Sequence, residues 1–424
     1  RQLFTRFRPQ ALDVALLADP GALEGDAAAN YRMLAACGCP IRREITPEMS
    51  RATIVVDALL GTGLKGPAAG QALEWIRRIN SDFPQAKVVA VDVPSGLMSD
   101  SGAVVGEAVR ADLTVTFTAP KPCLVLAPAC ELAGQVHVGQ IGTPASLYEQ
   151  DPAVALALAE PAMFAALLAP RPRSAHKGDF GHVLIIGGSR SKPGAAAMAG
   201  LAALRAGAGL VTVASAASAV QAIASHAPEL MTEPLPETAA GGISLEALNS
   251  GLLGALVRGK DVVALGPGLG TDPETVALVR RLAAGLEQWV VVDADGLNAL
   301  AGSDFSGKNL ILTPHPGEMG RLLGVSTAEA QRDRLEAARR LAAGRRATVV
   351  LKGQRTLIAF AGGSVTVNPT GTPAMATAGS GDILTGLIAG LLAQSPQRME
   401  EAVTAAVYLH GRAGELGARV MGEQ

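Results

Sequence analysis

A Gly-Ser-Gly-Asp sequence stands directly before a long apolar run near the end of this 424-residue chain. Gly379, Ser380 and Gly381 precede Asp382, and ILTGLIAGLLA then follows with helical spacing. Free backbone N–H groups at the start of a helix, with no side chains in the way, attract phosphate oxygens. Asp382 could take a proton from an attacking hydroxyl while the N–H groups stabilise charge on a transferring phosphoryl group. The pattern therefore predicts a phosphate-binding turn with a catalytic base.

A purely structural role for Asp382 is the alternative, because Asp is a good helix N-cap. A cap alone does not require two nearby glycines, which cost stability through backbone entropy. We therefore favour the chemical role. The stretch is neither a Walker A loop, since GxxxxGK[ST] is absent, nor a GxGxxG dinucleotide fingerprint.

Other apolar runs of the second half also end in glycines or polar residues. Ligands of open α/β sheets bind outside the carboxyl ends of the strands, so these positions are candidate binding residues. Singly, each signal is weak: a glycine after a strand is more often a turn, a histidine between prolines is more often a structural hydrogen-bonding group, and Lys352 could be a solvated cation. The combination favours a site. The candidates are Gly187, Gly188, Ser189, Gly266, Gly268, Gly270, His315, Lys352, Gly353 and Thr356.

Two segments of the first half show a similar arrangement, VVDALLGTGLKGP (55–67) and VAVDVPSGLMSDSG (89–102). Each reads as a strand that ends in Asp and continues into a glycine-rich loop. Backbone N–H groups of residues 61–63 could bind a phosphate, and Asp57, Asp92 and Ser95 supply oxygens that suit a hard cation. From these residues alone, two tight loops capped by Asp are an equally good interpretation.

The elements that position these residues are apolar β-rich runs alternating with helical patterns, which is typical of parallel βαβ units. We predict an α/β fold with two domains: an incomplete N-terminal Rossmann-like parallel sheet over residues 1–147, and a second α/β domain over 175–424. Around 145–175 the pattern breaks, with four prolines and no strand signal, so residues 148–174 are predicted to be a linker containing a short helix. The expected strands are 13–18, 52–60, 86–94, 113–120, 181–189, 208–215, 261–268, 289–296, 309–318 and 348–353.

Composition limits the possible functions. With 49% hydrophobic and 17% charged residues the chain can bury large cores, and its net charge of -2 gives no bulk attraction to nucleic acid or anionic membranes. The most apolar segment is interrupted by Glu160 and Pro161, which makes it a poor membrane span, and no signal peptide is visible. We therefore expect a cytoplasmic protein with reduced, buried cysteines, and one without a paired-cysteine metal site. These cysteines are Cys37, Cys39, Cys123 and Cys130.

Residues of about 175–424 resemble the ribokinase-like ADP-dependent NAD(P)H-hydrate dehydratase family. Six motifs match in order: HKGDFGHVLIIGGS, GPGLG, DADGLNAL, LTPHPGEM, VLKGQRT and NPTGTPAMATAGSGDILTG. The resemblance implies a ribokinase-like fold and a lyase that acts on NADH or NADPH damaged by addition of water to the nicotinamide ring. Such an enzyme phosphorylates the ring hydroxyl with ADP, releases AMP and then eliminates phosphate.

The same resemblance implies roles for individual residues. Asp382 would be the catalytic base and a substrate contact, and Mg²⁺ would bridge phosphates and waters. The alanine that contacts the substrate is one of residues 195–197. Ala195 is the first candidate among these alanines, and the other implied contacts to the hydrate are Gly268 and His315. The implied nucleotide site consists of Lys352, Gly353, Gln354, Arg355, Thr356 and Gly381.

Residues 1–145 resemble the NAD(P)H-hydrate epimerase family, whose members interconvert the two epimers of the hydrate. The resemblance implies that Asp92 contacts substrate and acts as acid and base, and that Asp57 and Ser95 bind potassium. The implied phosphate-region contacts are Gly61, Thr62, Gly63, Leu64, Lys65, Gly66 and Pro67. The family's upstream Asn-Asn-Gly-Gly-Asp loop is missing from a sequence that opens on RQLFTRF, so we expect a trimmed chain with weak or no epimerase activity.

Three other functions fit the sequence less well. An ATP-dependent kinase of a small alcohol or vitamin precursor shares the Gly-Ser-Gly-Asp logic, but the LTPHPGE and KGQRT context and the epimerase-like half disfavour it. A non-catalytic nucleotide sensor would not need both the glycines and the Asp. A NAD-dependent oxidoreductase lacks its fingerprint. We expect a homo-oligomer that binds NAD(P)H hydrates and ADP, and neither nucleic acid nor membrane.

Overall fold

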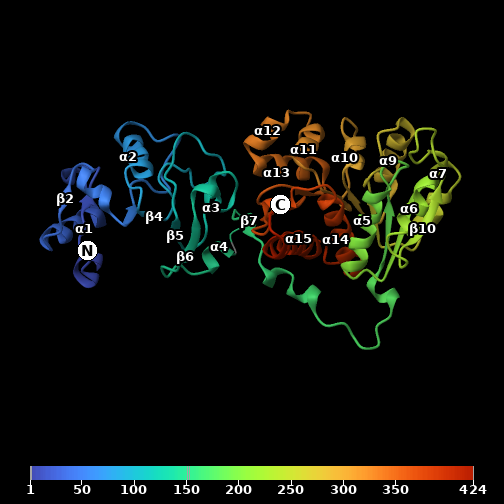
Figure 1. Ribbon diagram of the computed structural model, residues 1–424, viewed down its shortest axis with the longest axis horizontal. Helices are drawn as coiled ribbons and strands as arrows, with labels where there is room; N and C mark the ends of the chain where they lie inside the picture. The colour runs from blue at the N-terminus through green and yellow to red at the C-terminus, as the bar shows by residue number, and fades with distance from the viewer. Residues whose placement is uncertain (1, 150, 152, 424) are drawn as a thin grey trace. The chain divides into compact units, whose positions relative to one another are not determined.

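The computed structural model describes residues 2–149, 151 and 153–423, and it divides into two compact units, Arg1–Leu147 and Tyr148–Gln424 (Figure 1). Positions 1, 150, 152 and 424 of the predicted domains and linker lie outside the described residues. In the described part of the chain, no helix is both long enough and apolar enough to span a bilayer.

The first unit contains a four-stranded parallel sheet of order β3-β4-β5-β6. Buried and less buried positions alternate along β4 and β5, and β3 leaves Ile54 and Val56 exposed. These strands are therefore only partly buried, although the sequences of β3 and β4 are nearly continuous apolar runs. The helix α2 (Gly70–Ser81) contributes Trp75, Ile76 and Ile79 to the buried interior. The strands are β3 (Ile54–Asp57), β4 (Lys87–Val91), β5 (Leu113–Phe117) and β6 (Gln135–Gly139).

A separate pair of short strands precedes this sheet. The strand expected over 13–18 forms only at β1 (Val14–Ala15), which pairs in parallel with β2 (Ile41–Arg42). The helix α1 (Gly25–Ala36) connects the two strands. The first half therefore has the predicted parallel βα organisation, with its first expected strand in a sheet of its own.

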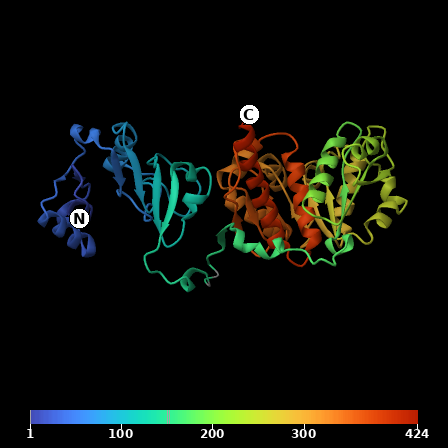
Figure 2. The same ribbon diagram turned by 60° about the horizontal axis from the view of Figure 1, so that its bottom comes forward.

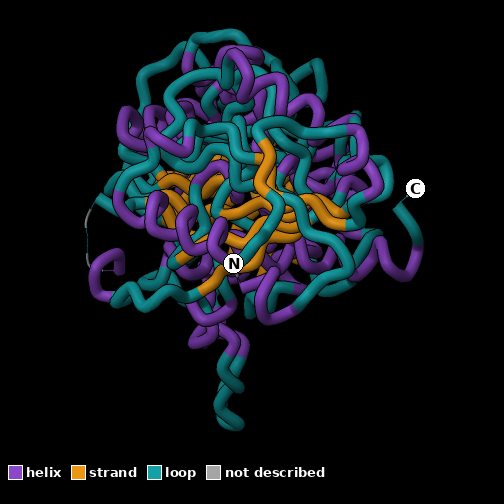
Figure 3. The backbone as a smooth tube through the Cα atoms, turned by 90° about the vertical axis from the view of Figure 1, so that its left-hand side faces the viewer, coloured by secondary structure: helices purple, strands orange, loops and turns teal. Residues whose placement is uncertain are grey.

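The second unit is built on a ten-stranded sheet of order β10-β9-β8-β11-β12-β13-β14-β15-β16-β7, drawn among the orange strands of Figure 3. The strands from β10 to β14 are parallel, β15 is antiparallel to both of its neighbours, and the central strands are buried along their whole length. Continuous apolar runs such as VVAL and TVVL produce this burial, because helices cover both faces of the sheet. The strands are β7 (Leu156–Leu158), β8 (His182–Ile186), β9 (Leu210–Ala216), β10 (Met231–Leu235), β11 (Val262–Leu265), β12 (Trp289–Val292), β13 (Leu310–Leu312), β14 (Thr348–Leu351), β15 (Leu357–Ala359) and β16 (Val365–Val367).

Helices α5 (Pro193–Arg205), α14 (Ser380–Gln394) and α15 (Met399–Met421) share one core with one face of this sheet (Figure 2). Other helices follow the parallel strands and place the loops at the carboxyl ends of the strands side by side. They are α9 (Pro273–Gly285), α10 (Asp295–Leu300), α11 (Pro316–Leu323) and α13 (Arg334–Arg345).

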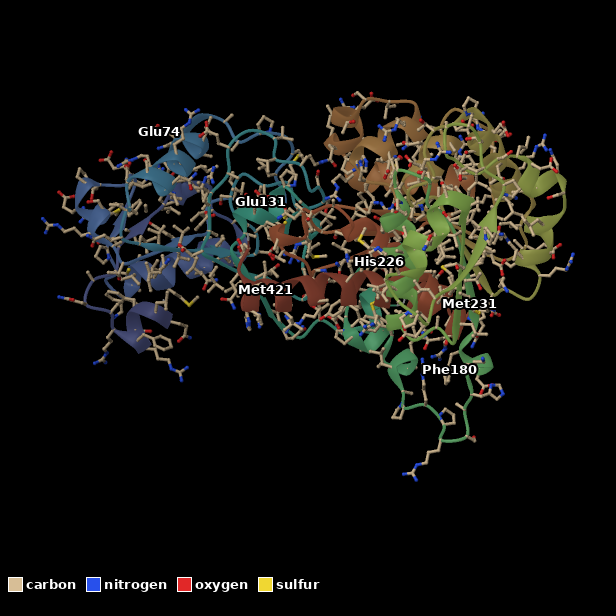
Figure 4. All side chains as sticks on the ribbon, turned by 45° about the vertical axis from the view of Figure 1, so that its right-hand side comes forward. Glu74, Glu131, Phe180, His226, Met231 and Met421 are labelled. Atoms are coloured by element: carbon tan, nitrogen blue, oxygen red, sulfur yellow. The ribbon has the colours of Figure 1, made fainter. Side chains whose placement is uncertain are left out.

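The segment predicted to be a linker without a strand contains β7, which pairs in parallel with β16. That part of the prediction is wrong: prolines on both sides of the run hid an edge strand, and edge positions tolerate proline. The segment is also fixed elsewhere, since Phe164 is buried and Arg171 Nη2 donates to the Gly207 carbonyl at 2.6 Å. The same guanidinium lies 3.6 Å from the ring centroid of Phe180, which is labelled in Figure 4.

Glycines let α14 approach α5 closely. A Cβ at Gly386 would lie 2.1 Å from the Ala199 carbonyl oxygen, and one at Gly390 would lie 2.6 Å from that of Ala203. We expect Gly386→Ala to lower the free energy of unfolding by about 1–3 kcal/mol or more, because the helices must move apart. Thermal melting of the full chain measures the effect.

A matched control comes from α15. A Cβ at Gly417 would meet only Met421 Cε, at 3.5 Å. Gly417→Ala should therefore stabilise the protein by about 0.5–1 kcal/mol through helix propensity. Equal melting temperatures for the two variants would contradict the close-packing explanation.

Candidate active site

The Gly-Ser-Gly-Asp sequence forms the start of α14. Gly379, with φ of +88°, is the N-cap, and the cap makes no side-chain hydrogen bond. Asp382 lies in the first turn, and its half-buried carboxylate has no hydrogen-bond or ion-pair partner among the residues that the structure describes. The alternative in which Asp382 serves only as a helix cap therefore does not apply. A half-buried carboxylate without a partner is available to accept a proton.

The surroundings of Asp382 make it a better base than an exposed Asp. Burial and the negative charge of Asp293 raise the pKa of Asp382 to about 6, against the opposing charge of Lys352. Because this value lies below neutral pH, the carboxylate is mostly ionised there. It also lies close enough to neutrality for efficient proton transfer.

The two glycines before Asp382 have different roles. Gly379 has a positive φ of 88°, and a Cβ there would meet only the end of the flexible Met198 side chain, so its backbone conformation is what calls for glycine. A Cβ at Gly381 would lie 3.3 Å from Lys352 Nζ and 3.7 Å from Asp293 Oδ2. The bare backbone of Gly381 therefore lies beside an ammonium group, which is a suitable environment for a phosphate.

Lys352 follows β14 and is not an ordinary solvated cation. Its Nζ donates to Asp293 Oδ1 at 2.7 Å and lies 3.9 Å from Glu318 Oε2, and its side chain is only 20% exposed. Arg334 of α13 holds the backbone of this loop by donating to the carbonyls of Lys352 and Gln354. The structure thus brings Lys352 to the start of α14. This agrees with the expectation that binding residues lie at the carboxyl ends of the strands.

The rest of the predicted nucleotide segment forms the loop between β14 and β15. Gly353 and Arg355 have positive φ values of 129° and 54°. Arg355 Nη1 donates to the Pro369 carbonyl at 3.2 Å, Thr356 Oγ1 donates to that of Gly353 at 2.9 Å, and Gln354 is exposed. The contacts of Arg355 and Thr356 thus shape the loop itself. Lys352 is the residue of this segment whose side chain lies at Asp293 and Gly381.

His315 is the N-cap of α11. Its Nδ1 accepts from the backbone N–H of Gly317 at 3.0 Å, and Glu318 accepts from the backbone N–H of His315 at 2.8 Å. Burial and the charge of Lys352 lower the pKa of His315, so the imidazole is neutral at pH 7. His315 is therefore a structural hydrogen-bonding group, which was one of its two possible roles. Its imidazole is also half exposed, next to Glu318, so it can contact a ligand as well.

The loops after β8 and β11 meet beside α5. A Cβ at Gly268 would lie 3.1 Å from Ala195 Cβ, and Gly188 N–H donates to the Pro267 carbonyl at 2.7 Å. Of the three candidate alanines, Ala195 is partly exposed, while Ala196 and Ala197 are buried. The structure therefore places Ala195 against Gly268, as expected if both contact one ligand.

Two acidic residues beside Lys352, Asp293 and Glu318, were not among the candidates from the sequence. Asp293 is buried and accepts from Lys352 Nζ, from Thr313 Oγ1 at 2.8 Å and from Thr385 Oγ1 at 2.8 Å. Burial raises the pKa of Glu318 to about 7, against the lowering effect of Lys352. Asp293 directly follows the run WVVV, so its place at the carboxyl end of a strand could have identified it as a candidate.

The first unit holds a second cluster at the ends of β3 and β4. Ser95 donates its N–H to Asp57 Oδ2 at 2.8 Å and its hydroxyl to Oδ1 at 2.6 Å, and burial raises the pKa of Asp57. Leu60 N–H donates to Ser95 Oγ at 2.8 Å, which joins this pair to the loop 61–67. That loop is mostly exposed, and nothing lies within 4 Å of a Cβ added at Gly61 or Gly63. Its backbone is therefore open to a ligand.

Asp92 follows β4 with a φ of +69°, which is strained for a residue other than glycine. Its Oδ1 accepts from Lys121 Nζ at 2.5 Å and from Thr116 Oγ1 at 3.0 Å. Burial alone would raise the pKa of Asp92, but the bonds from Lys121 and Thr116 hold it below its usual value. Lys121 was missed, although it follows the run LTVTFTAP.

Comparisons with known proteins agree with this two-part organisation. Residues 183–422 match the family model described as NAD(P)H-hydrate dehydratase, and residues 8–123 match that of the YjeF-related protein N-terminus. The bifunctional NAD(P)H-hydrate repair enzyme Nnr of Moorella thermoacetica is 44% identical, over 98% of this chain and 80% of that protein. The enzyme of the same name from Escherichia coli strain K12 is 38% identical, over 86% of this chain and 67% of its own length.

Solved structures resemble the second unit. The ADP/ATP-dependent NAD(P)H-hydrate dehydratase of Bacillus subtilis, co-crystallised with ATP/Mg²⁺, matches with a TM-score of 0.53 and 33% identity, over 62% of this chain and 90% of that chain. A ribokinase-like superfamily protein of Enterococcus faecalis matches with a TM-score of 0.55 and 31% identity, over 62% of this chain and 89% of its own. The predicted ribokinase-like α/β fold is confirmed.

Proposed function

Because this chain belongs to the family of bifunctional NAD(P)H-hydrate repair enzymes, we propose that it restores NADH and NADPH from their hydrates. The second unit carries the dehydratase, which consumes ADP and releases AMP and phosphate. The first unit carries the epimerase, which interconverts the two hydrate epimers. The observation that carries the dehydratase is the Asp382 carboxylate at the start of α14, which has no hydrogen-bond or ion-pair partner among the described residues and feels the positive charge of Lys352.

In this proposal Asp382 accepts the proton of the ring hydroxyl. The hydroxyl oxygen then bonds to the terminal phosphorus of ADP, and the bond from that phosphorus to the AMP oxygen breaks. The backbone N–H groups at Gly381 and the Lys352 ammonium stabilise the charge on the transferring group. Phosphate then leaves with its C–O bond electrons while the neighbouring ring carbon loses a proton, and the double bond returns.

The remaining contacts divide between hydrate and nucleotide. We propose that Ala195, Gly268 and His315 contact the hydrate, supported by the partly exposed Ala195 against Gly268 and by the neutral, half-exposed imidazole. The loop 352–356 and Gly381 bind the nucleotide. The described residues contain no cluster of three or more His, Cys, Asp or Glu that could hold a metal ion, so Mg²⁺ would take its ligands from phosphates and waters.

We propose Asp92 as the acid and base of the epimerase unit. The loop 61–67 binds the phosphate region of the hydrate in this proposal, and Asp57 and Ser95 are potassium ligands. Asp57 fits a cation because it is a buried carboxylate with no ion-pair partner in the part of the chain that is described. Potassium would supply the positive charge that Asp57 lacks. We also propose a homo-oligomer in the cytoplasm, which size-exclusion chromatography and cell fractionation test.

One experiment tests the proposed function. The protein is given mixed hydrate epimers with ADP, with ATP or without a nucleotide, and the return of reduced cofactor is followed by its absorbance. We expect recovery that requires a nucleotide and yields AMP and phosphate when ADP is supplied. A stable phosphorylated product without recovery would favour the small-alcohol kinase instead. Complete recovery would indicate an active epimerase unit, and recovery of one epimer alone would indicate an inactive one.

A further inference from the structure

The turn after β12, Asp293-Ala294-Asp295, helps to raise the pKa of Asp382 but carries out no step of the proposed reaction. Asp293 is 1% exposed and accepts hydrogen bonds from the end of β13, from the loop after β14 and from α14. Its single ion-pair partner among the described residues is Lys352. A buried charge that joins three elements fixes whatever it binds, because breaking one contact leaves an uncompensated charge.

The backbone of this turn is strained. Ala294 has φ of +47° and ψ of −120°, a region that residues with a side chain rarely adopt. Its neighbours hold it there: a Cβ at Gly266 would lie 1.9 Å from the Asp293 carbonyl oxygen, and one at Gly296 would lie 2.7 Å from that of Leu265. Such strain persists where the surrounding structure fixes it, and it is concentrated at functional sites.

The turn determines where the Lys352 ammonium lies, because Asp293 accepts a hydrogen bond from it. A lysine side chain carries a compact charge on a flexible stem, and it loses much rotamer freedom when it is held in one place. Here its Nζ is held at 2.7 Å from Asp293 Oδ1, next to the bare backbone of Gly381. The ammonium is therefore already in place before a nucleotide arrives.

We propose that Asp293 is a positioning residue, whose buried carboxylate holds the Lys352 ammonium at the start of α14 to receive the terminal phosphate of a nucleoside diphosphate. The inference rests on the proposed function, because it assigns the ligand of that site. Asp293 does not touch the nucleotide and acts through Lys352. A purely structural Asp293 would stabilise the fold without setting nucleotide affinity.

A double-mutant cycle separates these roles. The dissociation constant of ADP is measured by calorimetry for the wild type, Asp293→Asn, Lys352→Met and the double variant, with thermal melting of each. We expect Asp293→Asn to weaken ADP binding by about 10- to 100-fold, as loss of a fixed charge-assisted contact should. In the Lys352→Met background the same change should have almost no further effect on binding. The KM for ADP should rise while the KM for the hydrate stays unchanged.

The control is Asp304→Asn, which alters a fully exposed carboxylate that pairs with Arg345. It should change neither the dissociation constant of ADP nor the KM for ADP. The inference is overturned if Asp293→Asn lowers the melting temperature but leaves ADP affinity unchanged, or if its effect persists in full without Lys352. A wild-type protein that binds no ADP would overturn the proposed function as well, so the two failures are distinguishable.

A second measurement needs no variant, in case Asp293→Asn does not fold. Lysines of the wild type are acetylated with acetic anhydride, and the rate at each site is read by peptide mass spectrometry. Lys352, whose side chain is 20% exposed, should react more slowly than Lys192 at 52%, and saturating ADP should slow Lys352 further. An unchanged rate at Lys352 with ADP present would overturn the inference.

Discussion

Asp382→Asn is expected to fold normally and to lose about 10²- to 10⁴-fold in the rate of ADP-dependent cofactor recovery, the contribution typical of a positioned general base. The amide is nearly isosteric with the carboxylate but cannot accept the proton of the ring hydroxyl at neutral pH. The fold should be retained because Asp382 is not the helix cap and has no hydrogen-bond partner among the described residues. Single-turnover recovery of NADH and a thermal melt measure the two effects.

The pH dependence of the wild type gives an independent check. A base works only when ionised, and the pKa of Asp382 is raised to about 6, so the rate should fall as pH drops through about 6. Glu318, with a pKa of about 7, lies in the same cluster, so the profile of Asp382→Asn must be compared with that of the wild type. Asp304→Asn is the control for an ordinary surface carboxylate. Full activity of Asp382→Asn would remove the base assignment.

The fold of the second unit could be predicted largely from periodicity, because buried parallel strands are continuous apolar runs. The runs VVAL, WVVV and TVVL correspond to β11, β12 and β14. The strands that escaped prediction are short or lie at edges, such as β10 with its internal proline in MTEPL. Their sequences carry little β signal, and their pairing depends on contacts with residues far away in the chain.

The grouping of the candidate residues could also be predicted in outline, from the order of strands and loops. Asp382, Gly381 and Lys352 come together because parallel strands deliver their carboxyl ends to one edge of the sheet. What sequence could not show is which groups pair there. Asp293 lies 59 positions before Lys352 in the chain, and only the fold brings its carboxylate to the ammonium. The burial that raises the pKa of Asp382 and Glu318 is likewise a property of the folded chain.

Gly266→Ala is the substitution in the LGPGLG segment for which we expect the largest loss. Gly266 has φ of +134°, and a Cβ there would lie 1.9 Å from the Asp293 carbonyl oxygen and 2.9 Å from the Gly296 nitrogen. Both are backbone atoms, so relief requires moving the turn that carries Asp293. We expect a loss of about 3 kcal/mol or more in the free energy of unfolding, from a forbidden φ together with overpacking. ADP affinity should fall in the remaining folded protein, because Lys352 loses its fixed partner.

The control for this prediction is Gly270→Asn in the same segment. Gly270 has φ of +82° and nothing within 4 Å of an added Cβ, and Asn tolerates the left-handed region better than other residues with a side chain. Its melting temperature should therefore stay close to that of the wild type. Chemical denaturation and ADP calorimetry on both variants make the comparison. Equal stability of the two would show that the contact between Gly266 and the Asp293 turn is not tight in solution, and the positioning of Lys352 would then need another explanation.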